Sequence, residues 1–252
     1  MMNTVTVRNI TFGTGTPLIC VPLMGKTREE IVVNAHELLL QKADLVEWRV
    51  DHFSQVSDQA AVKSVLSALR DIMPATPLLF TFRSKKEGGE CQLSDDDYFA
   101  LNAMAAGSGL VDLIDVELFN DEKRIAQLVG IAHECNVRVI MSNHDFHKTP
   151  PKEEIIWRLR RMQELGADLP KIAVMPQTRQ DVLVLLDATT TMAELYATQP
   201  LITMSMGKLG VISRLCGEVF HSSMTFGAVG QASAPGQISV SAMRAVLPLL
   251  SA

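Results

Sequence analysis

A lysine interrupts an apolar run in the segment Pro170-Lys-Ile-Ala-Val-Met175. Lysine is rarely buried without a partner, so Lys171 has two explanations. At the N-terminal end of a strand it could reach solvent and be purely structural. Held inside, it would be desolvated, and desolvation favours the neutral amine that attacks a carbonyl carbon. The segment therefore indicates a candidate nucleophile for Schiff-base chemistry.

Two histidines follow a second apolar run, in Met141-Ser-Asn-His-Asp-Phe-His147. His144 falls at the expected end of a strand, and His147 falls after it, next to the next expected helix. Histidine can take and return a proton near neutral pH, which suits general acid–base catalysis. We expect His144 to be the acid–base group and His147 to support His144 without contacting the substrate itself.

Charged residues alternate with apolar ones in Glu47-Trp-Arg-Val-Asp51. Strand periodicity puts Glu47, Arg49 and Asp51 on one face and Trp48 on the other. Charges that face a protein interior are costly unless they are paired or bind a ligand. For Asp51, near the end of the strand, we expect an internal ion pair.

The next two strands carry more inward charges. Arg83 shares the parity of Thr81, and we expect it to contact a ligand. Asp115 and Glu117 share one face of the following strand. They could form a carboxylate pair or a metal site, but we expect them to pair with the arginines.

Small residues dominate the segment Gly227–Gln237, which suits either a mobile lid or an ordinary loop. Met204 and Met206, at the end of the preceding strand, could line a pocket or pack the core.

The elements that must position these side chains are eight short apolar runs about 30 residues apart, the length of one βα unit. Amphipathic helical patterns fill the gaps, and this alternation predicts an α/β fold, a (β/α)8 TIM barrel. Active sites of such barrels lie at the C-terminal ends of the strands. The expected strands are Leu18–Pro22, Asp44–Val50, Leu78–Arg83, Val111–Leu118, Val137–Ser142, Lys171–Met175, Leu201–Met204 and Met224–Ala228.

The segment Thr4–Gly13 alternates valine and threonine and predicts a hairpin that covers the barrel floor. Residues 1–252 contain no linker that would divide them, so we expect one domain. Helix starts are expected where a short polar side chain can accept from backbone N–H groups. These N-caps are Thr27, Ser57, Ser94, Thr149, Thr178 and Ser239.

The 252 residues carry a net charge of −5, which argues against a nucleic-acid or anionic-membrane binder. The four cysteines show no zinc or disulfide spacing. No segment is long and apolar enough to span a membrane, and no signal peptide is recognisable. The first strand is followed by neither GxGxxG nor GK[ST], so dinucleotide and P-loop functions are excluded. We expect a cytoplasmic protein with a small-molecule substrate.

Over nearly the whole chain, the sequence resembles type I 3-dehydroquinate dehydratases, particularly the enterobacterial members. Several long motifs in the right order carry this resemblance, and together they are far more specific than any one of them. The motifs are Glu47-Trp-Arg-Val-Asp-His52, Leu78-Leu-Phe-Thr-Phe-Arg-Ser84, Glu87-Gly-Gly-Glu90, Met141-Ser-Asn-His-Asp-Phe-His-Lys-Thr-Pro150, Pro170-Lys-Ile-Ala-Val-Met-Pro176, Ile202-Thr-Met-Ser-Met206, Gly210-Val-Ile-Ser-Arg-Leu215 and Ala232-Ser-Ala-Pro-Gly-Gln-Ile238.

The resemblance implies a class I aldolase-like barrel that removes water from 3-dehydroquinate in the shikimate pathway, without cofactor or metal, as a homodimer. Lys171 would form an imine with the substrate ketone. His144 would act as base and then acid, and Glu87 would orient it. Arg214 would bind the substrate carboxylate. The other implied substrate contacts are Glu47, Trp48, Arg49, Arg83, Ser233 and Gln237, with Met204, Met206, Phe226 and Pro22 along the wall.

Two departures from the family pattern concern the rim of the site. Pro22 stands where close relatives carry a serine, and proline lacks both the hydroxyl and the N–H. Gly230 and Gln231 stand where relatives tend to carry two lysines. We expect these changes to alter affinity or lid behaviour and to leave the chemistry intact.

The residues by themselves leave three other functions open. A class I aldolase would share Lys171, although a sugar substrate without a carboxylate would leave Arg214 unexplained. A metal-dependent hydrolase could use His144, Asp145 and His147 together with the carboxylates of Asp115 and Glu117, but the first strand lacks an HxH pair. A non-catalytic barrel would not need the set of Lys171, His144 and Glu87.

Overall fold

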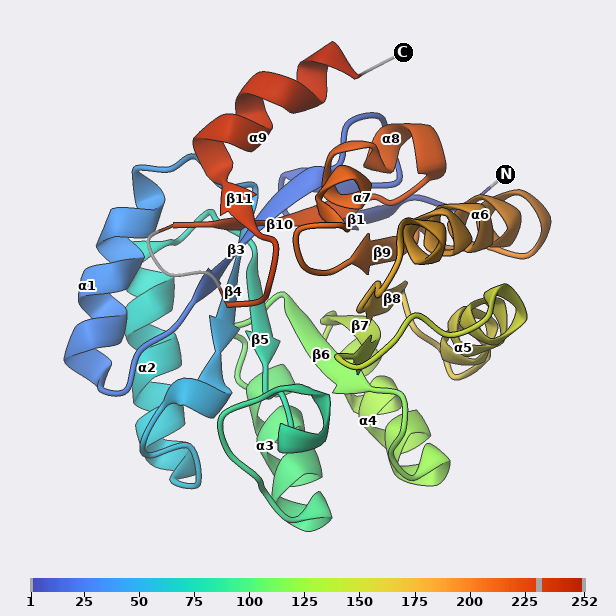
Figure 1. Ribbon diagram of the computed structural model, residues 1–252. Helices are drawn as coiled ribbons and strands as arrows, with labels where there is room; N and C mark the ends of the chain where they lie inside the picture. Colours follow the sequence, from blue (N-terminus) through green and yellow to red (C-terminus); the bar gives the residue numbers. More distant parts are fainter. Residues whose placement is uncertain (1, 230–232, 251–252) are drawn as a thin grey trace.

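The eight apolar runs form parallel strands of one curled sheet in the computed structural model, which describes residues 2–229 and 233–250 (Figure 1). The ring closes where Leu201 bridges to Ser222, and a short additional strand, β11 (Ile238–Ser239), pairs with the last one. The barrel prediction is confirmed. The strands are β3 (Leu18–Leu23), β4 (Leu45–Arg49), β5 (Leu78–Thr81), β6 (Leu113–Glu117), β7 (Arg138–Asp145), β8 (Leu169–Val174), β9 (Ile202–Ser205) and β10 (Met224–Ala228).

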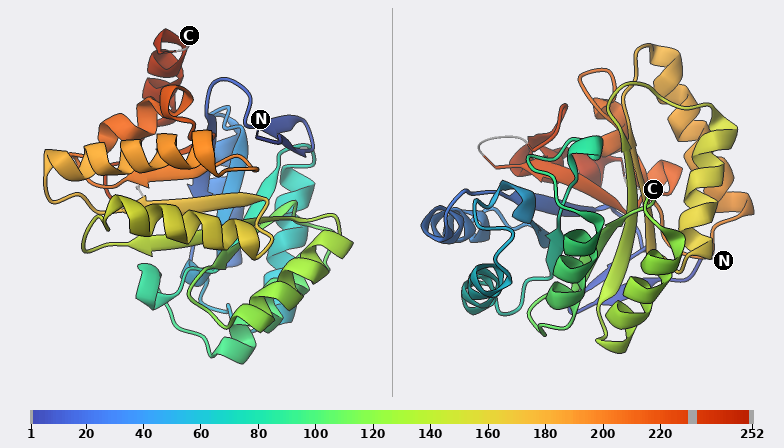
Figure 2. Two further views of the ribbon diagram at one scale, coloured as in Figure 1. Left: turned by 90° about the vertical axis from the view of Figure 1, so that its right-hand side faces the viewer. Right: turned by 90° about the horizontal axis from the view of Figure 1, so that it is seen from below.

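Helices surround the sheet, and α5 and α6 lie side by side across its outer face (Figure 2). Four of them begin after the polar caps that we expect, namely Thr27, Ser94, Thr178 and Ser239. The helices are α1 (Arg28–Leu39), α2 (Gln59–Ile72), α3 (Asp95–Ala106), α4 (Glu122–Glu134), α5 (Lys152–Glu164), α6 (Arg179–Leu195), α7 (Val211–Leu215), α8 (Gly217–Phe220) and α9 (Val240–Val246), with 3-10 turns η1 (Val50–His52), η2 (Lys85–Glu87) and η3 (Leu247–Leu249).

Two of the expected caps are wrong. Asp58, and not Ser57, caps α2, because its carboxylate accepts from the backbone N–H groups of two residues in the first turn. Helix α5 begins at Lys152 with Pro151 as its N-cap, and Thr149 lies outside it. The tandem prolines explain the shift, since a residue before proline is driven out of the helical region.

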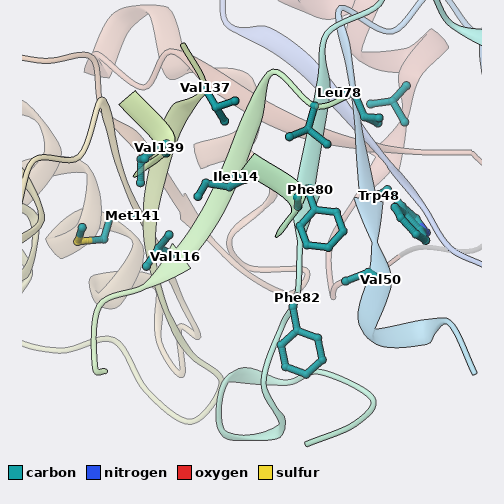
Figure 3. Packing of buried hydrophobic residues seen from close by; sticks show 14 of the residues in the cluster. Trp48, Val50, Leu78, Phe80, Phe82, Ile114, Val116, Val137, Val139 and Met141 are labelled. Carbon is teal, nitrogen blue, oxygen red and sulfur yellow. The ribbon is translucent and has the colours of Figure 1, made fainter. Parts of the chain in front are cut away.

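An outer core fills the space between the sheet and the helices (Figure 3). Trp48 is completely buried there and meets the ring of Phe80 edge-on, with the centroids 5.7 Å apart. The prediction that the Trp48 side chain contacts substrate is therefore wrong. The strand alternation that turns Glu47 and Arg49 inward turns Trp48 away from the barrel interior.

The hairpin of β1 (Val5–Val7) and β2 (Ile10–Phe12) closes one end of the barrel, as predicted. Its apolar side chains pack against residues at the beginnings of the strands, such as Leu45 and Leu79. The opposite end, where the strands finish, is left to carry the polar side chains. The sequence change at Gly230 and Gln231 lies outside the described residues.

Candidate active site

Lys171 is the third residue of β8 and is only 2% exposed. Its register partner on β7 is Ser142, so its side chain arises well inside the barrel and not at the floor. The Nζ lies 3.4 Å from Oδ2 of Asp115 and 4.6 Å from the centroid of the Phe226 ring. The solvent-exposed alternative for this lysine is therefore wrong.

His144 and Glu87 form a tight pair. Oε2 of Glu87 accepts from the backbone N–H of His144 at 2.9 Å and lies 2.9 Å from the ring Nδ1. Its other oxygen, Oε1, accepts from the side-chain amide of Asn143 at 3.1 Å. The strand β7 runs on to Asp145, so His144 is part of the strand, and Glu87 approaches it from the turn η2.

Burial shifts the pKa of both members of this pair. Burial, and to a smaller extent the negative charge of Glu117, raises the pKa of Glu87 from 4.5 to about 8. Burial and then the cations of Arg83 and Lys171 lower the pKa of His144 well below its ordinary value. The imidazolium form is therefore disfavoured in the unliganded protein, and the neutral ring keeps one nitrogen able to accept a proton.

Arg83 is surrounded by acceptors from the neighbouring strands. Its guanidinium donates to Oε1 of Glu117 at 2.9 Å, to Oδ1 of Asp115 at 2.7 Å and to the Ser142 hydroxyl at 3.0 Å. The expectation that the β6 carboxylates pair with an arginine is confirmed. Burial alone would lower the pKa of Arg83. The negative charges of Asp115 and Glu117 outweigh burial and raise the pKa above its ordinary value.

Arg49 donates to both oxygens of Asp51, at 2.9 and 2.8 Å, which confirms the expected ion pair. Asp51 also accepts from the backbone N–H of Glu90 at 3.1 Å. Burial opposes ionisation of Asp51, but the hydrogen bonds and charge of Arg49 outweigh it and lower the pKa of this carboxyl. This pair fastens the segment that carries Glu87.

Arg214 is the exception among the buried arginines. It is 1% exposed, its Nη2 donates to the carbonyl of Pro235 at 3.1 Å, and its Nη1 lies 3.6 Å from the sulfur of Met204. No carboxylate pairs with it within the described part of the chain, and its Nε has no hydrogen-bond partner there. Burial lowers the pKa of Arg214 to about 10. A buried cation in this state favours an anionic ligand.

One cavity brings most of the predicted site residues together. Ser233 and Gln237 belong to it and bond to each other, through two contacts of 3.0 Å. Pro22 lines a neighbouring hollow that shares Arg49 and Ser233. The predicted residues in the cavity are Glu47, Arg49, Arg83, Glu87, His144, Lys171, Met204, Met206, Arg214, Phe226, Ser233 and Gln237.

Sequence reasoning missed part of the wall. Gly88 and Phe146 line the cavity, and a Cβ on Gly88 would lie 2.5 Å from the Phe146 ring. Ala173 also lines it, and the parity it shares with Lys171 could have revealed it. His147 is exposed and faces an adjoining cavity, and no contact of its side chain with His144 supports the role expected for it.

No group of three or more His, Cys, Asp and Glu side chains in residues 2–229 and 233–250 could hold a metal ion. None of the helices described there is both long and apolar enough to cross a membrane.

The fold and the cavity define a (β/α)8-barrel enzyme of the class built around a buried lysine. The type I 3-dehydroquinase family model matches residues 19–252. The 3-dehydroquinate dehydratase of Klebsiella pneumoniae subsp. pneumoniae is 66% identical over 251 residues, with 100% of both chains covered. That of Listeria monocytogenes serotype 4b is 59% identical, with 99% of this chain and 98% of the relative covered.

A crystal structure of the Clostridium difficile type I 3-dehydroquinate dehydratase, with covalently modified comenic acid, has a TM-score of 0.97. It is 57% identical, and the match covers 99% of this chain and 98% of that one. The chain belongs to the type I 3-dehydroquinase family, and the family prediction is confirmed.

Proposed function

We propose that this chain removes water from 3-dehydroquinate to give 3-dehydroshikimate, through an imine on Lys171. Membership in the family supports the reaction. The observation that carries the proposal is the placement of Lys171, His144 and the unpaired cation Arg214 in one cavity. A nucleophile, a proton carrier and a carboxylate anchor are what a carboxylated hydroxy ketone requires.

The first step joins the neutral amine of Lys171 to the substrate ketone, and one proton taken up from solvent balances the positive charge as the ketone oxygen leaves as water. The product is a cationic iminium, which withdraws electrons from the neighbouring carbon and makes its proton more acidic. Asp115 lies beside the nitrogen, and the charges of Arg83 and Lys171 outweigh its burial and lower the pKa of its carboxyl. The carboxylate therefore remains to compensate the positive iminium.

His144 then takes the proton from the carbon next to the iminium. Glu87 holds Nδ1, which leaves Nε2 to act as the base. The same ring returns the proton to the departing hydroxyl, so that water leaves and not hydroxide. Proton transfer of this kind contributes roughly 10² to 10⁴ in rate. Hydrolysis of the imine frees the product.

Arg214 binds the substrate carboxylate through its planar fork. Its burial in an apolar setting strengthens the bond, since no protein carboxylate competes for the guanidinium in the described residues. Gln237, Ser233 and Glu47 present polar atoms to the ring hydroxyls. Fixing the ring at both ends aligns the reacting carbon with His144.

The test is conversion of 3-dehydroquinate by the purified protein, followed by the ultraviolet absorbance of the conjugated product. We expect turnover by the wild type and none by Lys171→Ala. Turnover that persists in Lys171→Ala would contradict the imine route. No turnover by a folded wild type, together with cleavage of aldol substrates, would favour an aldolase.

We also propose that the chain is one domain and works as a cytoplasmic homodimer. Three exposed apolar side chains on α6, α7 and α8 support self-association, namely Leu183, Ile212 and Val219. Sedimentation equilibrium tests this proposal, and a mass of one chain at micromolar concentration would contradict it.

A further inference from the structure

Asn143 links the catalytic pair to a helix outside the barrel. Its side-chain amide donates to Oε1 of Glu87 at 3.1 Å, and its carbonyl oxygen accepts from Nη1 of Arg158 at 2.6 Å. Both residues are buried, Asn143 at 3% and Arg158 at 7% exposure. The proposed mechanism assigns no role to either of them.

The chemistry of arginine fixes the direction of this chain of hydrogen bonds. Arginine can only donate, so the oxygen of the Asn143 amide must face Arg158 and the NH₂ must face Glu87. The reversed amide would place its oxygen against an oxygen of Glu87 and its NH₂ against a guanidinium. Arg158 therefore decides which atom Glu87 meets.

We propose that Arg158 and Asn143 are positioning residues that hold the Glu87 carboxylate, and through it the His144 ring, in the orientation needed for proton transfer. This inference rests on the proposed function. Glu87 needs such support because it lies on η2, a 3-10 turn of three residues, and not on a strand. With Asn143 in place, Glu87 meets three N–H groups, two of them from His144.

Arg158 is itself well anchored. It lies in the middle of α5, forms an ion pair with Glu154 one turn earlier, and sits 5.3 Å from the centroid of the Phe119 ring. The helix thus provides a rigid base that the turn η2 lacks. Rigid secondary structure positions a site more accurately than a loop does.

The charges around the pair set the direction of the pH effect. Glu87 is faced by Glu117 and Arg83, and the hydrogen bond from Asn143 lowers its pKa against burial. His144 is faced by Arg83, Lys171 and Arg49, and all three disfavour its imidazolium. Loss of the Asn143 donor therefore raises the pKa of Glu87 above about 8, and the acid limb of the pH–rate profile moves to higher pH.

The decisive variants are Asn143→Asp and Arg158→Gln. Asn143→Asp is isosteric and keeps an acceptor for Arg158, so it protects the fold while replacing the donor to Glu87 by a carboxylate oxygen. We expect kcat to fall about tenfold or more, with KM within about twofold, because a charged hydrogen bond is lost. Arg158→Lys should restore part of the rate. The control on the same helix is Arg160→Met, which removes an exposed guanidinium beside the Tyr196 ring and should keep wild-type kcat and pH profile.

The variants are compared with a wild type that turns over 3-dehydroquinate. An inactive wild type would contradict the proposed function and would not bear on the roles of Asn143 and Arg158. Thermal melts identify any variant that is unfolded. A folded Asn143→Asp with an unshifted acid limb and kcat within about twofold of wild type would overturn the proposal. So would a loss of kcat by Arg160→Met equal to that of Arg158→Gln.

Discussion

The Nζ of Lys171 lies 3.4 Å from Oδ2 of Asp115, and both side chains are buried. The other oxygen of Asp115 accepts from Arg83 and from the Ser142 hydroxyl, both at 2.7 Å. Asp115 therefore faces two buried cations, one of them the proposed nucleophile, and it shares the other, Arg83, with Glu117. This arrangement makes Asp115 important for both stability and chemistry.

Asp115→Asn should lower the free energy of unfolding by about 3 to 5 kcal/mol, because it removes the carboxylate that pairs with the buried Lys171 and one of those that pair with Arg83. It should also lower kcat at least about tenfold, since the iminium loses its counter-charge. Asp112→Asn is the matched control. It breaks ion pairs with Arg8 and Arg70 outside the cavity and should destabilise the fold at unchanged kcat. Urea unfolding and kinetics at a temperature where both variants are folded separate the two effects, and equal kcat in both would contradict the prediction.

Arg214→Met should raise KM for 3-dehydroquinate by about a hundredfold, the value of a strong charge-assisted hydrogen bond. The same change should increase the free energy of unfolding by about 1 kcal/mol, because an unpaired buried cation is replaced by an apolar side chain. Arg160→Met, which removes an exposed guanidinium 4.8 Å from the Tyr196 ring centroid, should do neither. A variant that binds substrate normally would contradict the carboxylate role of Arg214. A variant that is less stable would show that the hydrogen bond to Pro235 outweighs the cost of the buried charge.

Glu87→Gln should change how stability depends on pH. The Glu87 carboxyl holds its proton more tightly in the folded chain, where its pKa is about 8, than at its ordinary value of 4.5. Its contribution to stability is therefore complete below about pH 4.5 and is lost as the pH rises to about 8. His144, whose pKa is lowered, contributes the opposite slope in both proteins.

Glutamine does not titrate, so Glu87→Gln should gain stability relative to wild type between about pH 5 and pH 8. Chemical denaturation at both pH values measures this difference. A gap between variant and wild type that is the same at both values would contradict the raised pKa of Glu87.

Trp48→Phe tests the corrected position of Trp48. The smaller ring leaves a cavity in the outer core, which should lower the free energy of unfolding by about 1 to 3 kcal/mol. Because the side chain does not reach the substrate cavity, kcat and KM should stay at wild-type values. A tenfold increase of KM in a folded Trp48→Phe protein would contradict this prediction and would indicate that Trp48 contacts the substrate.

Periodicity predicted the strands and which of their residues face inward, since both depend on local sequence. It placed Glu47 and Arg49 correctly against Trp48. Periodicity could not predict the burial of Lys171. That burial depends on the closure of the barrel and on β8 starting at Leu169, two residues before the expected start at Lys171. The caps at Ser57 and Thr149 failed because a neighbouring carboxylate and a proline pair changed where each helix starts.

The relationships that define the site join residues far apart in the chain. Among the described residues, Arg214 has no carboxylate partner although carboxylates lie elsewhere in the barrel, and no local sequence pattern predicts this. The hydrogen bonds from Arg158 through Asn143 to Glu87 span three separate segments. Resemblance to the family supplied roles for individual residues, but only the packed barrel shows which groups support them.

Trapping of the imine tests the central claim most directly. The protein is mixed with 3-dehydroquinate, reduced with borohydride, and measured by intact mass followed by peptide mapping. We predict one ligand-sized adduct on Lys171, and no adduct in Lys171→Ala. An unmodified mass in a protein that still forms the conjugated product, or an adduct confined to another lysine, would contradict the role of Lys171.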